Sequence, residues 1–170
     1  VLRRALAEAR AAWPADDPRA LQVLTNLSNV ANRRERHAEA EALAREGLRA
    51  IESLAARSLG RSRPLSILDV GCAYGPFLAR ARERGHEPRG FDVSEEAVAY
   101  VRGELGIPAA SGDFLDQDVA SPLGGPFDAL SMWYVVEHFA DLGKALRNAA
   151  ALVRPGGVLA LSTPSGEGAS

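Results

Sequence analysis

Cysteine is almost absent from this chain, because Cys72 is the only one among 170 residues. A single thiol cannot form an internal disulfide, and it also excludes a metal site built from four thiolates. We therefore expect a protein of a reducing compartment, the cytoplasm. Long hydrophobic runs are lacking as well: none approaches the roughly 20 residues that a membrane-spanning helix needs. The sequence thus predicts no membrane partner.

The chain also lacks an excess of basic charge. Its formal net charge is −2, so the chain as a whole lacks the positive charge that is typical of nucleic-acid-binding proteins. This favours a small-molecule substrate. The charge is unevenly spread, with +4 over residues 1–63 and −6 over residues 64–170. This asymmetry predicts a separate N-terminal element, which we assign to residues 1–62, lying against a more acidic domain over 63–170.

The N-terminal element is predicted to be helical. Residues 1–12 are rich in Ala, Arg and Leu, and apolar residues recur at helical spacing over residues 18–34. A stronger amphipathic pattern covers residues 35–60 and ends at Gly60, a typical helix stop. Two such helices resemble one unit of a helical repeat such as the tetratricopeptide repeat, but stacked repeats need at least ~3 units. A helical cap packed on the main domain is therefore favoured.

From Pro64 onward, short apolar runs alternate with helical segments. The predicted strands cover residues 65–70, 87–93, 107–113, 127–136 and 157–164, and the predicted helices 75–85, 94–106 and 141–157. Alternation with short links is typical of parallel strands covered by helices. Because crossovers are right-handed, the sequence predicts an α/β fold with a doubly wound, mostly parallel sheet of about five strands.

The first predicted strand ends in "DVGCAYG", where Asp69 is followed by Gly71, Ala73 and Gly75. Ligands of doubly wound sheets bind beyond the carboxyl ends of the strands, and glycines there let a ligand approach the backbone. Asp92 closes the second strand 21 positions after Gly71, where an acidic residue typically binds ribose hydroxyls. The segment 71–76, "GCAYGP", has no glycine at its last position, where the dinucleotide-binding pattern G-x-G-x-x-G has its third glycine. This difference counts against a nicotinamide or nucleotide-sugar enzyme.

The spacing D-x-G-x-A-x-G resembles motif I of class I S-adenosylmethionine-dependent methyltransferases, with Ala73 in place of the middle glycine. Further stretches follow in that family's order: "GFDVSEEAV" (90–98), "SGDFLD" (111–116), "FDALSMWYVVEHF" (127–139) and "LVRPGGVLALSTP" (152–164). The resemblance covers roughly residues 64–164. It implies a Rossmann-like methyltransferase domain that uses S-adenosyl-L-methionine and methylates oxygen or nitrogen of a small-molecule acceptor.

The resemblance also implies residue roles. Asp92 would bind the two ribose hydroxyls, Asp113 would accept from the adenine amino group, and Phe114 would lie on the adenine ring. The glycine row would approach the amino acid end of the cofactor, whose ammonium Asp69 would attract. The complete set of predicted cofactor-binding residues is Asp69, Gly71, Ala73, Gly75, Asp92, Val93, Asp113, Phe114, Trp133 and Tyr134.

His138 is the predicted catalytic residue, because a histidine beside the expected methyl-transfer position can act as a general base near neutral pH. A structural role is the alternative for His138, and core packing is the alternative for Trp133 and Tyr134. His86 is predicted to lie on the surface and Cys72 to pack in the glycine loop. No metal site is predicted.

Two other functions fit the same scaffold. An aminopropyl transferase would need an acidic pocket after the fourth strand, where "SMWYVVEHF" is apolar and aromatic. A helical adaptor with an inactive methyltransferase-like domain would have no need of Asp69, Gly71 and Asp92. The family's sheet usually has seven strands. We therefore expect a domain truncated at its C-terminus, or a fifth-strand edge covered by a partner such as a second copy.

Overall fold

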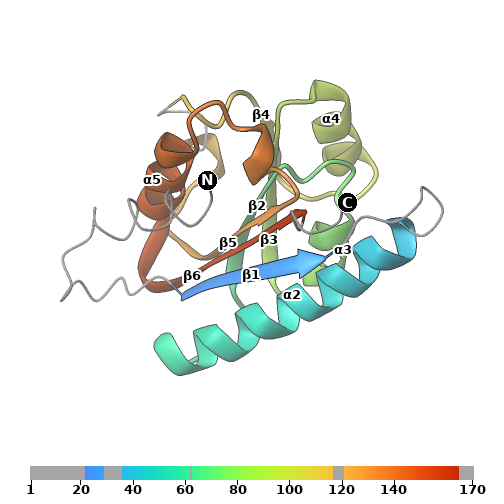
Figure 1. Ribbon diagram of the computed structural model, residues 1–170. Helices are drawn as coiled ribbons and strands as arrows, with labels where there is room; N and C mark the ends of the chain where they lie inside the picture. The colour runs from blue at the N-terminus through green and yellow to red at the C-terminus, as the bar shows by residue number, and fades with distance from the viewer. Residues whose placement is uncertain (1–21, 29–35, 62, 117–120, 165–170) are drawn as a thin grey trace, which may run out of the picture.

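One parallel β-sheet organises the described part of the chain, which in this computed structural model comprises residues 22–28, 36–61, 63–116 and 121–164. Its strands lie in the order β1-β6-β5-β2-β3-β4, and each neighbouring pair is parallel (Figure 1). The strands are β1 (Gln22–Ser28), β2 (Ser66–Val70), β3 (Glu87–Asp92), β4 (Ala109–Ser111), β5 (Phe127–Trp133) and β6 (Val153–Pro164). The helices are α2 (Arg36–Ser58), α3 (Pro76–Glu83), α4 (Glu95–Gly103) and α5 (Leu142–Leu152), with 3-10 turns η1 (Ser121–Leu123) and η2 (Val136–His138). The predicted doubly wound α/β fold is confirmed, with one strand added to the predicted five.

Helices cover both faces of the sheet. Leu48 of α2 and Phe77 of α3 form one buried cluster with Ile67 of β2. Leu146 of α5 belongs to a second cluster with Leu68, the next residue of β2. Because neighbouring strand residues point to opposite faces, α2 and α3 lie on one side of the sheet and α5 lies on the other. The sheet is therefore the middle of three layers (Figure 1).

Local sequence explains most of these elements. Every residue of β5 from Phe127 to Met132 is buried, as expected for a strand covered on both faces. Helix α4 begins where predicted, because the Ser94 hydroxyl accepts a hydrogen bond from the Ala97 amide, and two glutamates occupy the first turn. Gly60, with φ +69°, follows α2 as the predicted stop. No helix in the described ranges is both long and apolar enough to cross a membrane.

The helix predicted over residues 18–34 is wrong, because residues 22–28 form strand β1. Short apolar runs fit helix and strand equally well, so periodicity alone does not decide between them. In the structure the open edge of β6 decides, since β1 pairs with it in parallel from Gln22↔Val158 to Ser28↔Pro164. The rest of that predicted helix, and the one over 1–12, lie outside the described residues.

This pairing also changes the prediction for the sheet edge. The edge of β6 was expected to be open or covered by a partner, and it is covered by β1 of the same chain. The described part of the predicted N-terminal cap therefore contributes one strand to the sheet and one helix, α2, that packs on it. Figure 1 shows β1 at the edge of the sheet, next to β6.

His86 is buried, so the prediction of a surface position is wrong. Its Nδ1 accepts a hydrogen bond from the Leu65 amide at 3.2 Å, and its Nε2 therefore carries the proton that it donates to Glu52 of α2 at 2.9 Å. Arg63 and Arg84 also donate to the Glu52 carboxylate. Burial alone would raise the pKa of Glu52, but these hydrogen bonds outweigh it and lower the pKa to about 2. The network ties α2 to the start of β3.

Candidate active site

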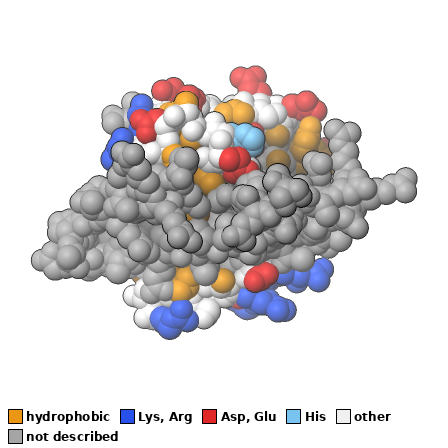
Figure 2. All heavy atoms as spheres, in the orientation of Figure 1, with side chains coloured by type: hydrophobic (Ala, Val, Ile, Leu, Met, Phe, Trp, Pro, Cys, Tyr) orange, Lys and Arg blue, Asp and Glu red, His pale blue; other side chains and the backbone are white. Residues whose placement is uncertain are grey.

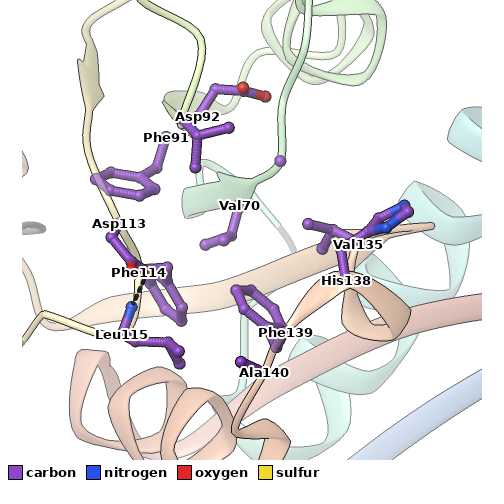
Figure 3. A pocket seen from close by; sticks show the side chains of 12 residues that line it. Val70, Phe91, Asp92, Asp113, Phe114, Leu115, Val135, His138, Phe139 and Ala140 are labelled. Atoms are coloured by element: carbon purple, nitrogen blue, oxygen red, sulfur yellow. Dashed lines mark hydrogen bonds between the residues drawn. The ribbon is translucent and has the colours of Figure 1, made fainter.

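A cleft of about 440 Å³ opens at the carboxyl ends of β2, β3 and β5 (Figure 3). Its walls come from the loop after β2, the end of β3, the loop after β4, and η2 with the residues that follow it. This is the edge where ligands of parallel α/β sheets bind. The predicted site residues that line the cleft are Gly71, Asp92, Val93, Asp113, Phe114 and His138.

The glycine loop adopts a backbone that side chains resist. Gly71 has φ +77°, Gly75 has φ +76°, and Ala73 has φ +47° although it is not a glycine. A Cβ on Gly71 would lie 2.8 Å from two side-chain atoms of Val135, and one on Gly75 would lie 2.7 Å from a methyl group of Leu105. The two glycines therefore meet local demands of conformation and packing; Gly71 also lines the cleft, whereas Gly75 is buried against Leu105.

Asp92 holds this loop against the start of α4. Its Oδ2 accepts a hydrogen bond from the Ala73 amide at 2.8 Å, and its Oδ1 accepts one from the Ser94 amide at 2.9 Å. A carboxylate has about four acceptor positions, so two remain for a ligand. The side chain is only partly buried and stands at the upper rim of the cleft in Figure 3.

Aromatic rings form the floor of the cleft. Phe114 is buried, with its ring centroid 5.7 Å from that of Phe91 and 5.9 Å from that of Phe139. Asp113 stands beside them on the surface, and its Oδ1 accepts a hydrogen bond from the Leu115 amide at 2.9 Å, the dashed line in Figure 3. An apolar floor with one exposed carboxylate suits a flat, partly polar ring system.

His138 lines the side of the cleft opposite to Asp113. It ends η2, and its imidazole ring is exposed (Figure 3). Neighbouring Phe139 and Ala140 continue the wall. The arrangement places a group that can exchange a proton at one end of the cleft and the carboxylates Asp92 and Asp113 at the other.

Trp133 and Tyr134 do not line this cleft. The ring of Trp133 packs over Gly47 of α2 and against Phe77 of α3, with ring centroids 5.4 Å apart, so it lies on the α2 and α3 face. Its Nε1 is buried and has no hydrogen-bond partner among the described residues. Tyr134 has φ +53°, and its amide donates to Ser162. The Trp133 ring thus lies away from the cleft, and Tyr134, like Ala73 and Gly75, is not among the residues that line it.

Asp69 lies behind the glycine loop and is buried. Burial raises the pKa of this carboxyl to about 7, assisted by the charge of Asp92 and opposed by a hydrogen bond from Ser131. Cys72 is buried beside it, as predicted for a packed residue, and burial raises the pKa of its thiol. Sequence reasoning did not single out Ser131, because only the β2–β5 register places it beside Asp69.

A family model described as a methyltransferase domain matches residues 33–169. The chain belongs to this methyltransferase domain family. The resemblance drawn from the five motifs is therefore confirmed, and the match also includes α2.

Similar proteins agree with this assignment. The ubiquinone biosynthesis O-methyltransferase of Caulobacter vibrioides is 30% identical over 102 residues, which are 58% of this chain and 40% of that protein. DesVI of Streptomyces venezuelae has the same fold with a TM-score of 0.63 at 22% identity, over 79% of this chain and 56% of that one. SAM-bound CalS10, an amino pentose methyltransferase from Micromonospora echinaspora, gives 0.59 at 22% identity, over 80% and 58%. The chain spans less than half the length of the curated relatives it matches.

Proposed function

We propose that this chain is the S-adenosylmethionine-binding domain of a methyltransferase that acts on oxygen or nitrogen of a small molecule. The observation that carries the proposal is the position of Asp92, which holds the glycine loop with two of its acceptor positions and leaves the others beside an apolar cleft. The relatives' printed activities, O-methylation in ubiquinone biosynthesis and methylation of an amino pentose, support a small acceptor.

The residues of the cleft fit the parts of this cofactor. The free positions of Asp92 suit the two ribose hydroxyls, and the surface formed by Phe114 and Phe139 suits the adenine. Val93 lines the same cleft and is 76% exposed, an apolar surface that a bound base would cover. Asp69 and the backbone of Gly71, which lines the cleft, suit the amino acid end and its ammonium.

Charge supports a cationic cofactor rather than a nucleic acid. Asp69, Asp92 and Asp113 lie in or directly behind the cleft. On the face shown in Figure 2, acidic side chains gather above the residues that are not described, and Lys and Arg lie mainly below them. A region of this sign attracts a sulfonium and an ammonium. The single cysteine agrees with the cytoplasm as the compartment of this activity.

The main contribution of the protein to methyl transfer is to position the two reactants and to exclude water. The bound cofactor supplies a methyl carbon already activated by a sulfonium. We assign to His138 the removal of a proton from the acceptor, because its exposed ring lies at the end of the cleft away from Asp113. Tyr134, which precedes Val135 of the cleft wall, stays a candidate for an acceptor contact, whereas the Trp133 ring packs against α2 and α3.

Calorimetric titration with S-adenosylmethionine and S-adenosylhomocysteine tests the proposal. The wild-type chain is expected to bind both compounds, Asp92→Ala to lose binding, and Asp92→Asn to bind weakly, because it keeps an acceptor oxygen but loses the charge. Glu83→Ala, which removes an exposed carboxylate of α3, is the matched control and should bind like the wild type. Absence of binding by a folded wild-type chain would overturn the proposal.

A further inference from the structure

The side chain of Ser131 makes a short contact with the buried carboxyl of Asp69. Its Oγ lies 2.6 Å from Oδ1 of Asp69, and both residues are buried, at 0% and 2% exposure. The same hydroxyl is 3.5 Å from the Leu68 carbonyl, so the contact with Asp69 is much the stronger of the two. Because a carboxylate only accepts, the hydroxyl donates to ionised Asp69.

No other side chain in the same row of the sheet can do the same. Ser131 and Asp69 are register partners of β5 and β2, so they stand side by side on one face. The same row continues to Ala160 of β6 on one side, and to Gly90 of β3 and Ala109 of β4 on the other. These three residues carry no polar side-chain atom. Within the described ranges, Oδ1 of Asp69 has the Ser131 hydroxyl, and no side chain donates to Oδ2.

We propose that Ser131 is a positioning residue for cofactor binding, whose hydroxyl holds Asp69 in its charged form with Oδ2 left for the ligand's ammonium. This inference rests on the proposed function. It assigns a role to a residue of β5 that touches neither the cleft nor any part of the glycine loop, and that acts only through Asp69.

The electrostatic surroundings explain why such support matters. Burial opposes the charge on Asp69 and raises its pKa to about 7, and the charge of Asp92 acts in the same direction. Cys72, the other titratable group that interacts with Asp69, stays a neutral thiol, because burial raises its pKa. The Ser131 hydroxyl is the contribution that lowers the pKa of Asp69. Asp69 therefore changes charge near neutral pH, so the loss of one hydrogen bond weakens binding at and below neutral pH, where it lowers the ionised fraction of Asp69, and has little effect well above it.

The experiment compares cofactor affinity from pH 6 to pH 9 in the wild type, Ser131→Ala and Ser131→Thr. In the wild type the affinity should rise with pH as Asp69 ionises. Ser131→Ala should move this rise upward by about one pH unit, which weakens binding about fivefold at pH 7 and nearly tenfold at pH 6 and leaves it almost unchanged at pH 9. Ser131→Thr keeps the hydroxyl and should restore the wild-type profile. The cofactor's own titration is common to all variants and cancels in the comparison.

A double variant separates positioning from packing. In an Asp69→Asn background, Ser131→Ala should change the affinity less than twofold, because the carboxylate through which Ser131 acts is gone. A loss of affinity in Ser131→Ala that is equal at every pH, or that persists in Asp69→Asn, would overturn the proposal and make Ser131 a packing residue. If Asp92→Ala abolishes binding while Ser131→Ala binds with the wild-type profile, the proposed function stands and this inference fails.

Discussion

Ala73 is the position where one substitution should stabilise this protein. It has φ +47°, in the left-handed region that costs an L-residue about 1–2 kcal/mol relative to glycine. The side chain is exposed, so its removal loses no buried surface. The hydrogen bond from the Ala73 amide to Asp92 involves only the backbone and is kept in Ala73→Gly.

The expected gain is the difference between two terms. Relief of the left-handed alanine contributes about 1–2 kcal/mol, and the greater freedom of glycine in the unfolded chain costs about 0.5–1 kcal/mol. We therefore expect Ala73→Gly to raise the free energy of unfolding by up to about 1.5 kcal/mol, with a central value of about 0.75 kcal/mol. For a domain of this size, each kcal/mol of added stability raises Tm by roughly 2–4 °C.

Two neighbouring glycines provide matched controls of opposite sign. Gly75→Ala should cost about 1–2 kcal/mol, because the Leu105 methyl group it would meet is the end of a side chain that can move. Gly71→Ala should cost more, by about another 1–3 kcal/mol, because the Cβ of Val135 is fixed to the backbone. Urea unfolding followed by circular dichroism measures all three. If Ala73→Gly were destabilising while Gly75→Ala were neutral, the reasoning from backbone conformation would be refuted.

Three further changes test the buried polar groups and the face covered by α2. Because the pKa of Glu52 is lowered to about 2, its ionisation contributes up to about 3 kcal/mol to the free energy of unfolding. This contribution is present above pH 4.5 and is lost as the pH falls toward 2. In urea unfolding, Glu52→Gln should therefore be less stable than the wild type at pH 7, and its stability should change less with pH below pH 4.5. Because the pKa of Asp69 is raised to about 7, its ionisation destabilises the fold as the pH rises from 3.8 to 7. In thermal unfolding at pH 8, Asp69→Asn should therefore be more stable than the wild type by up to about 4 kcal/mol. A lower Tm for Asp69→Asn than for the wild type would contradict this. Gly47→Ala places a Cβ 2.4 Å from the Trp133 ring and should cost about 1–3 kcal/mol, but much less in a Trp133→Phe background; equal costs in both backgrounds would speak against this contact.

The sequence was most informative where local pattern and fold agree. From Pro64 to Pro164 the alternation of apolar runs and capped helices predicted the order of the described strands and α-helices, because apolar runs and a cap such as Ser94 can be recognised from adjacent residues. The helix predicted over 141–157 was too long, since α5 ends at Leu152 and β6 begins at Val153. It was least informative for residues 22–28, whose conformation depends on pairing with β6 at the far end of the chain. The hydrophobic periodicity of residues 22–28 does not indicate that β6 offers an edge with which they can pair.

The candidate site divides in the same way. Gly71, Asp92 and Asp113 lie at or just after the ends of strands, so motif spacing alone located them at the cleft. Trp133 also ends a strand, but its side chain points to the α2 face, which depends on the parity of β5 and on the space above Gly47. Ser131 and the burial of His86 needed the register and the placement of α2, which are long-range properties.

The pairing of β1 with β6 has a consequence for how the chain folds. β1 is the first described strand and β6 the last, yet they are neighbours in the sheet. During synthesis β1 therefore has no partner until the segment that forms β6 has left the ribosome, whereas β2 to β5 can already assemble with their helices. Such a non-local contact forms late and slowly, because closing the long loop between the two strands costs conformational entropy before their contacts stabilise the fold. We expect hydrogen exchange during refolding to protect β2 and β5 before β1, the last of the described strands to dock.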